Sequence, residues 1–134
     1  MRIVVIDAQG GRIGKQLISA IRKELPQLDI TAVGTNGAAT AAMLSAGPDR
    51  AATGENAVAV ACRTADVILG PVGVAIADSM LGEVTPAMAL AVGQSRARRI
   101  LIPFDNCDTV IVGASEAPVG RRVQAAVDAL RDSL

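Results

Sequence analysis

The N-terminal stretch joins a short apolar run to an amphipathic segment through a turn rich in glycine. Residues 2–6, RIVVI, form a continuous β-branched run, which is typical of a strand covered on both faces of a sheet. Gly10, Gly11 and Gly14 follow, and apolar side chains then recur at helical spacing up to Leu25. A strand, a tight glycine turn and a helix in this order predict the start of a parallel α/β fold.

The rest of the chain repeats this alternation of apolar runs and helical patterns. Strands are expected over residues 2–6, 29–34, 65–70, 99–104 and 109–113. Helices are expected over residues 13–25, 37–46, 54–64, 73–81, 86–96 and 119–130, with 54–64 also compatible with a strand. The expected N-caps are Thr35 or Asn36 for the second helix, Thr53 for the third, and Thr85, followed by Pro86, for the fifth. The pattern predicts a single Rossmann-like domain over residues 1–134, in which a doubly wound, mostly parallel five-stranded sheet forms a three-layer α/β sandwich.

The composition limits the kinds of site that the chain can build. Of its 134 residues, 51% are apolar, yet Phe104 is the only aromatic residue and there is no histidine. Without histidine the chain has no Ser-His-Asp or Cys-His catalytic set, and metal ligands would have to be carboxylates or thiols, so we expect no metal. Thirteen basic and thirteen acidic side chains give no net charge. The sequence has no stripe of basic residues, so we do not expect binding to nucleic acid.

The cysteines and the apolar segments bear on the cellular compartment. Cys62 and Cys107 do not form a CxxC pair, which favours free thiols in a reducing cytosol over a disulfide. The N-terminus has no signal-peptide pattern. The most apolar stretch, residues 67–77, is too short to span a bilayer and is interrupted by Gly70 and Pro71. We therefore expect a cytoplasmic protein without a membrane partner.

Small and polar residues gather where the predicted strands end. In parallel α/β sheets, ligands bind in the crevice beyond the carboxyl ends of the strands. The candidate binding residues at that edge are Gly10, Gly11, Arg12, Gly14, Thr35, Asn36, Glu55, Asn56, Asp105 and Asn106. Turns favour Gly, Asn and Asp for structural reasons as well, so an interpretation without a ligand stays open.

The glycine turn matches the dinucleotide-binding fingerprint G-x-G-x-x-G in part. Gly11 and Gly14 occupy its second and third positions, whereas Gln9 replaces the first glycine. In this interpretation, the amides at the start of the helix hold a phosphate. Residues 34–36, GTN, provide no carboxylate to bind a ribose at the end of the second strand. This weakens the case for NAD as the ligand and permits NADP. Arg50 is a candidate partner for the 2′-phosphate of NADP.

Few side chains are candidates for catalysis. Asp7 ends the first strand and is a candidate general base, or else a brace for the glycine turn. Glu55 is the second candidate base, although an acid in the first turn of a helix also stabilises the helix. Asp78 and Glu83, which flank the segment SMLG, are expected to be solvated or at an interface.

An ordered set of short motifs resembles a known family. The motifs IDAQGGRIGK, GTN, ATGENA, ILGPVG and SMLGE, in this order, resemble a family of small uncharacterised bacterial proteins with a domain of unknown function. The resemblance covers nearly the whole chain. It implies a compact Rossmann-like domain with no assigned activity, and it carries no catalytic residues to this sequence.

Three functions remain in view. The leading hypothesis is the binding of a phosphate-bearing small molecule, a nucleotide or NADP-like dinucleotide, by a sensor, an accessory protein or a small enzyme. The first alternative is a structural or partner-binding protein without a ligand. We expect a homodimer, with the helix at residues 86–96 as its interface, because the small chain is rich in apolar residues. The second alternative is a small hydrolase or isomerase with a carboxylate base.

Overall fold

A five-stranded parallel sheet forms the centre of the molecule. The computed structural model describes residues 1–104, 109–114 and 117–134. The strands are β1 (Arg2–Asp7), β2 (Asp29–Gly34), β3 (Arg50–Thr53), β4 (Val67–Pro71) and β5 (Arg98–Ile102). They lie in the order β3-β2-β1-β4-β5, and every neighbouring pair is parallel. The expected doubly wound α/β class is confirmed.

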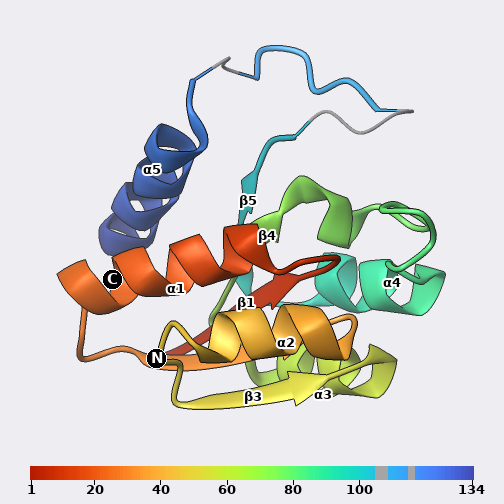
Figure 1. Ribbon diagram of the computed structural model, residues 1–134, viewed down its shortest axis with the longest axis horizontal. Coiled ribbons are helices and arrows are strands. Elements are labelled where there is room, and N and C mark those ends of the chain that lie inside the picture. Colours follow the sequence, from red (N-terminus) through yellow and green to blue (C-terminus); the bar gives the residue numbers. More distant parts are fainter. Residues whose placement is uncertain (105–108, 115–116) are drawn as a thin grey trace.

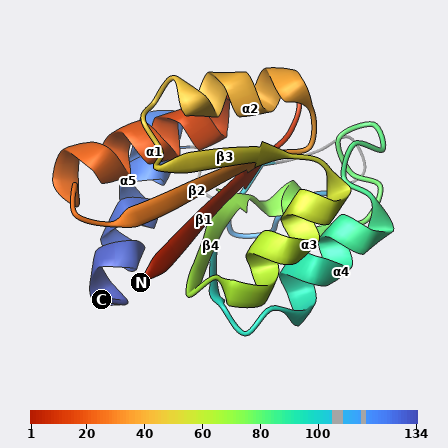
Figure 2. The ribbon, with the colours of Figure 1, turned by 90° about the horizontal axis from the view of Figure 1, so that it is seen from below.

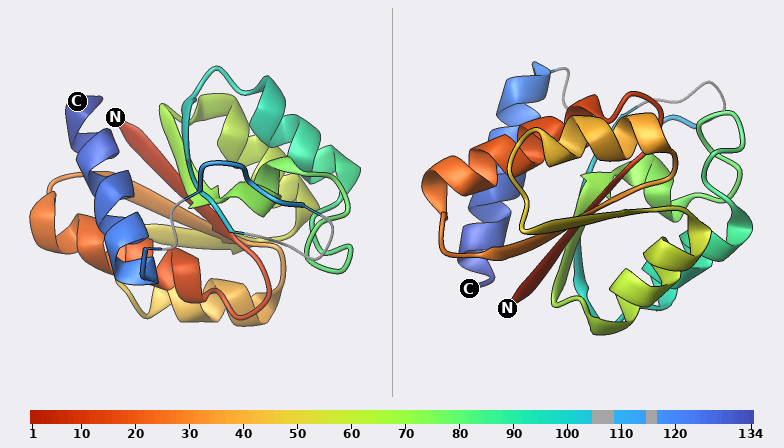
Figure 3. Two further views of the ribbon diagram at one scale, coloured as in Figure 1. Left: turned by 90° about the horizontal axis from the view of Figure 1, so that it is seen from above. Right: turned by 60° about the horizontal axis from the view of Figure 1, so that its bottom comes forward.

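Helices cover both faces of the sheet and make three layers (Figure 1 and Figure 2). They are α1 (Arg12–Glu24), α2 (Gly37–Leu44), α3 (Glu55–Thr64), α4 (Pro86–Gln94) and α5 (Val119–Asp132), with a short 3-10 helix, η1 (Val72–Ala75). Helices α1, α2 and α5 lie on one face, and α3 and α4 lie on the other, as the two views in Figure 3 also show. The two chain ends lie on the same side of the molecule (Figure 3).

The sheet packs against its helices through two apolar cores, one on each face. Alternate residues of β1 point to opposite faces, so that Ile3 and Val5 join α1 and α5 while Val4 and Ile6 join α3 and α4. Every apolar side chain of β1 is at most 3% exposed. Burial on both faces explains why this strand is a continuous apolar run in the sequence.

The sheet order reverses between β1 and β4. The chain passes from β1 outward through β2 to β3, then crosses back to β4 and continues to β5. In such sheets the loops on either side of the reversal diverge, which leaves a crevice at the carboxyl ends of the strands. The loops that follow β1, β2 and β4 therefore position any site at this edge.

One expected strand is wrong, and one observed strand was not expected. Residues 109–113 do not form a strand, and the side chains of Val110 and Val112 are 76% and 94% exposed. Only Thr109 in this run takes part in a β-bridge, so its β-branched pattern does not suffice to form a strand. The strand that was not expected is β3, a short run of mostly exposed residues that pairs with β2.

The helices agree with the sequence better than the strands do. Residues 55–64 form α3, so the helix favoured over a strand for this segment is confirmed, with Gly54 rather than the expected Thr53 at its N-cap. Thr85 caps α4 through the Met88 amide, with Pro86 in the first turn, as the sequence indicates. The expected helix at 73–81 is wrong beyond its first turn. Only η1 is helical there, and turns occupy residues 77–83.

Candidate functional site

One carboxylate joins the three loops at the edge where the sheet order reverses. Glu83 lies between η1 and α4, and its Oε1 accepts a hydrogen bond from the Gln9 amide, after β1, at 2.9 Å. The same oxygen accepts from the Thr35 hydroxyl at 2.9 Å and from the Asn36 side-chain amide at 2.7 Å, both after β2. The loops that follow β1, β2 and β4 thus meet at a single oxygen atom.

The side chain of Asn36 is held in a fixed orientation by bonds on both of its ends. Its Oδ1 accepts from the Ala39 amide at 2.8 Å, which caps α2 and confirms one of the two caps favoured by the sequence. Its Nδ2 donates to the Gln9 carbonyl at 3.1 Å as well as to Glu83. The cap of α2 therefore also orients the donor that binds Glu83.

The contacts of Glu83 favour its charged form. Partial burial acts to raise the pKa of this carboxyl, but the hydrogen bonds from Gln9, Asn36 and Thr35 outweigh it, and the pKa lies below the ordinary value of 4.5. Glu83 is therefore an ionised acceptor at neutral pH.

Asp7 is the last residue of β1, and its side chain is only 4% exposed. Its Oδ2 accepts from the Gly14 amide and its Oδ1 from the Ala8 amide, each at 2.7 Å. Burial raises its pKa, these hydrogen bonds oppose the rise, and the negative charge of Glu83 adds to it. One oxygen thus binds the first turn of α1 and the other the beginning of the β1–α1 turn, which is the bracing role considered for Asp7. Its role as a base stays a prediction.

The glycines of the turn have different reasons for being glycine. Gly11 has a φ of 71°, and a Cβ there would lie 2.6 Å from the Ala39 carbonyl oxygen, on α2. A Cβ on Gly14 would overlap the Met43 side chain. These two glycines allow α1 to pack closely against α2, whereas a Cβ on Gly10 would make only an ordinary contact.

Two amides in this turn remain available. Within the described part of the chain, the backbone N–H groups of Gly10 and Arg12 donate to no protein acceptor. The side chain of Arg12 is exposed and, among the described residues, has no carboxylate partner. Gly10 and Arg12 could therefore hold an anion at the start of α1, whereas Gly14 already binds Asp7.

The other predicted site residues do not join this cluster. Glu55 and Asn56 are exposed at the start of α3, beyond the edge strand β3, and no hydrogen bond links them to Glu83. Asp105 and Asn106 lie outside the described residues. For all four, a binding role stays a prediction.

Arg50 is not placed to bind a 2′-phosphate. It begins β3 and bonds to Asp29, at the start of β2, with a distance of 2.7 Å between Nη1 and Oδ1. This pair lies at the amino ends of the strands, opposite the edge that carries Glu83. The premise that no carboxylate lies at the end of β2 is also wrong, because Glu83 reaches that point from the loop before α4.

Glu83 is the site residue that sequence reasoning missed. It was expected, like Asp78, to be solvated or at an interface; Asp78 is exposed, whereas Glu83 is partly buried and accepts three hydrogen bonds that this expectation did not include. Glu83 is separated from its partner Asn36 by 47 residues, and no local pattern relates the two. A lone acid after a glycine, at the end of a segment without periodicity, gave no signal of this contact.

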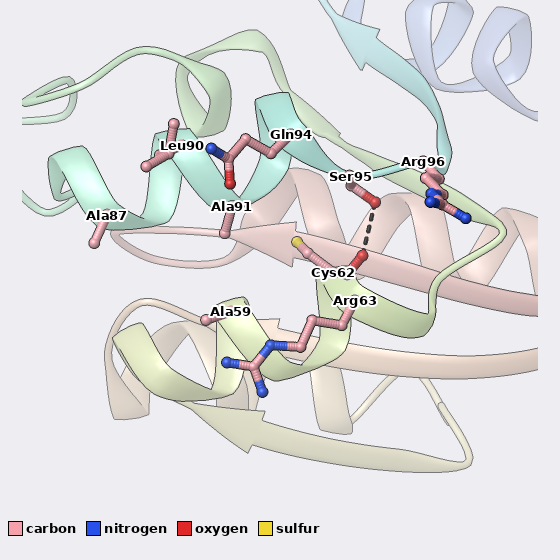
Figure 4. Close-up of a pocket in the computed structure, with 9 residues that line it drawn as sticks. All are labelled: Ala59, Cys62, Arg63, Ala87, Leu90, Ala91, Gln94, Ser95 and Arg96. Carbon is pink, nitrogen blue, oxygen red and sulfur yellow. Dashed lines mark hydrogen bonds between the residues drawn. The ribbon is translucent and has the colours of Figure 1, made fainter.

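Away from this edge, a groove of about 430 Å³ lies between α3 and α4 (Figure 4). Leu90 and several alanines form its apolar part, and Arg63 and Arg96 lie toward one end. The Ser95 hydroxyl donates to the Cys62 carbonyl at 2.7 Å across this groove. Burial raises the pKa of the Cys62 thiol to about 11, so this cysteine is a protonated, unreactive thiol at neutral pH.

The described residues contain neither a metal-binding cluster nor a membrane-spanning helix. None of their Asp, Glu and Cys side chains form a group of three that could hold a metal ion. None of the described helices is long and apolar enough to cross a membrane.

The comparisons with known proteins identify a family. Residues 2–134 match the family described as Domain of unknown function (DUF3842). No curated protein matches the sequence. Among solved structures, a dodecameric FMN-dependent UbiX-like decarboxylase from Escherichia coli O157:H7 is similar with a TM-score of 0.46 and 16% identity, over 98% of this chain and 77% of that one. Because that likeness is distant, we carry over no ligand and no residue role from it. The match over nearly all of its length shows that the chain belongs to the DUF3842 family.

Proposed function

We propose that the protein binds a phosphate-bearing small molecule of the nucleotide class in the crevice beyond β1, β2 and β4. One observation carries the proposal: three loops converge on Glu83 where the sheet order reverses, beside the available amides of Gly10 and Arg12. Crevices of this kind are the usual ligand sites of doubly wound sheets. Arg12, whose exposed side chain carries a positive charge, begins α1 next to these amides.

In this proposal the phosphate lies against the outer amides of the β1–α1 turn. The inner amide at the start of α1, that of Gly14, is taken by Asp7, so the phosphate cannot enter as deeply as in a cradle without this carboxylate. The nucleoside part of the ligand then extends past Thr35 and Asn36 toward Glu83.

A ligand screen by thermal unfolding tests the proposal directly. The chain has no Trp or Tyr, so unfolding is followed with an environment-sensitive dye in the presence of nucleoside monophosphates, ATP, NAD, NADP, coenzyme A and pyrophosphate. A ligand at about 100 times its dissociation constant adds about 2.7 kcal/mol of stability, which corresponds to a rise in Tm of roughly 10 °C.

A matched pair of variants locates the binding. Gly10→Asp places a negative charge beside the available amides at a position where a Cβ meets no obstacle. Gly93→Asp makes the same change at an exposed position of α4, also with open space. We expect Gly10→Asp to abolish the ligand-induced rise in Tm and Gly93→Asp to retain it. Equal rises in both variants would place the ligand elsewhere.

A second candidate function is partner binding by a homo-oligomer, which the groove between α3 and α4 favours. Leu90 is 57% exposed at this groove, beside Ala59, Ala87 and Ala91, which also line it. Apolar side chains grouped at the surface are typical of contact surfaces. If no probe raises the Tm, light scattering of the purified protein would decide between a monomer and the expected homodimer.

A further inference from the structure

The two oxygens of the Glu83 carboxylate have different surroundings. Oε1 accepts hydrogen bonds from Gln9, Thr35 and Asn36, while Oε2 receives no hydrogen bond from any described residue. Three donors on one oxygen fix the orientation of the carboxylate, and the second oxygen is an oriented acceptor without a donor among the described residues. Such an arrangement is suited to a ligand that offers hydrogen-bond donors.

The position of this acceptor is as informative as its orientation. In dinucleotide-binding sheets, an acid that follows β2 binds the hydroxyls of the ribose. Here the residues at the end of β2 are Gly34, Thr35 and Asn36, and two of them hold Glu83 in place. The acid is therefore present at the end of β2, although a different loop supplies it.

The loop that carries Glu83 is held by its own contacts. Its backbone adopts left-handed conformations at Asp78, Met80, Leu81 and Gly82, which reverse the chain immediately before Glu83. The Asp78 amide donates to the Val84 carbonyl at 2.7 Å, which closes this reversal on itself. The carboxylate is thus positioned by its loop on one side and by three donors on the other.

We infer that Glu83 determines the sugar specificity of the site: its Oε2 accepts hydrogen bonds from the hydroxyls of an unphosphorylated ribose, and its charge rejects a 2′-phosphate. This inference rests on the proposed nucleotide binding and specifies it further. The buried carboxylate of Asp7 lies near enough for the two charges to interact, which adds to the repulsion of a phosphate at this point. Arg50, the cation that could have offset that repulsion, is paired with Asp29 at the opposite edge of the sheet.

The test compares ligands that differ only at the ribose. NAD and NADP differ by the 2′-phosphate, and adenosine 5′-monophosphate and its 2′-deoxy form differ by one hydroxyl. By isothermal titration, we expect the wild-type protein to bind NAD and adenosine monophosphate more tightly than their counterparts, by about tenfold or more. Pyrophosphate, which has no ribose, serves as the probe of the phosphate site alone.

Two isosteric variants in the same loop distinguish a specific effect of Glu83 on the ribose from the effect of removing any negative charge from this loop. Glu83→Gln removes the carboxylate that binds the ribose, and Asp78→Asn removes an exposed carboxylate five residues earlier, at a left-handed position that Asn tolerates well. We expect Glu83→Gln to reduce both affinity ratios toward one while pyrophosphate binding is retained. Asp78→Asn should leave both ratios as in the wild type.

The outcomes distinguish this inference from the proposed function. Equal affinities for NAD and NADP in the wild-type protein would overturn the inference and leave nucleotide binding in place, and this measurement does not depend on any variant folding. Unchanged ratios in a folded Glu83→Gln protein would also overturn it. If no nucleotide and no pyrophosphate bind, the proposed function fails and the inference fails with it.

Discussion

The β1–α1 turn and the segment between η1 and α4 end at the same edge of the sheet but are held there by different forces. The first is short, and its shape depends on contacts with no spare space: Gly11 against Ala39, and Gly14 against Met43. The second spans residues 76–85, carries an almost fully exposed Leu81, and is joined to the first mainly through Glu83. Close packing fixes the first region, whereas the second is held by hydrogen bonds within its own turns, by the buried Val84 and by the three bonds to Glu83.

The two regions differ in how readily they can change their conformation. Packed glycine turns have no alternative arrangement at low cost, because any side chain added to them overlaps the neighbouring helix. The three hydrogen bonds to Glu83 can exchange with water or with a ligand, although the turns that carry Glu83 are closed by their own bonds. In the proposed site, the packed turn is therefore the fixed side, and the hydrogen bonds of Glu83 are the part that can exchange.

The largest expected effect is on the packed turn. Gly11→Ala combines a left-handed backbone with a Cβ that would lie 2.6 Å from the Ala39 carbonyl oxygen, and we expect a loss of about 3 kcal/mol or more in the free energy of unfolding. Urea denaturation followed by circular dichroism measures it. Gly10→Ala, at the neighbouring position with open space, should change stability by about 0.5 kcal/mol or less. Similar losses in the two variants would show that the packing of the turn does not set its shape.

A smaller effect is expected when the bonds of the second region are removed. Glu83→Gln weakens three hydrogen bonds to an ionised acceptor, so we expect a loss of about 1–2 kcal/mol at pH 7, partly offset by relief of the repulsion with Asp7. The folded-state pKa of Glu83 is depressed, so its contribution is fully present above the unfolded value of 4.5 and is lost as the pH falls through the folded value.

Denaturation at several pH values measures this contribution. The difference in stability between wild type and Glu83→Gln should be largest near neutral pH and should shrink as the pH falls below 4.5. Asp78→Asn is the control at pH 7, where we expect a change of about 0.5 kcal/mol or less for an exposed side chain. A difference that grows on acidification would contradict the assigned role of Glu83.

The smallest effect is expected at the tip of the second region. Leu81 is 97% exposed and has a φ of 59°, a backbone conformation that Asn adopts more readily than Leu. Leu81→Asn should leave the Tm unchanged or raise it slightly, by the equivalent of up to about 1 kcal/mol. A marked fall in Tm would show that the tip makes a stabilising contact in solution, as in an oligomer.

The accuracy of the sequence-based predictions differed between elements for physical reasons. The buried strand β1 and the amphipathic helices α1 and α5 were predictable because each carries the periodicity of its own burial. The caps of α2 and α4 were predictable because a cap is a local contact between residues three positions apart. For β3, small and exposed side chains gave no strand pattern.

The candidate site shows the same limit. The sequence correctly placed Thr35 and Asn36 together beyond β2 and the glycine turn beyond β1, because a parallel sheet brings the ends of its strands to one edge. It did not place Glu83 among them, and it treated Gly11 and Gly14 as phosphate contacts although close packing with α2 accounts for both.

The sequence by itself determined the α/β class, the order of most helices and strands and the membership of the family, since these depend on local periodicity, caps and ordered motifs. Only the tertiary structure decided that residues 50–53, and not 109–113, form a strand of the sheet, and which carboxylate reaches the end of β2. Both decisions depend on partners distant in the chain: β3 exists because it pairs with β2, and Glu83 is oriented because the loops after β1 and β2 donate to it.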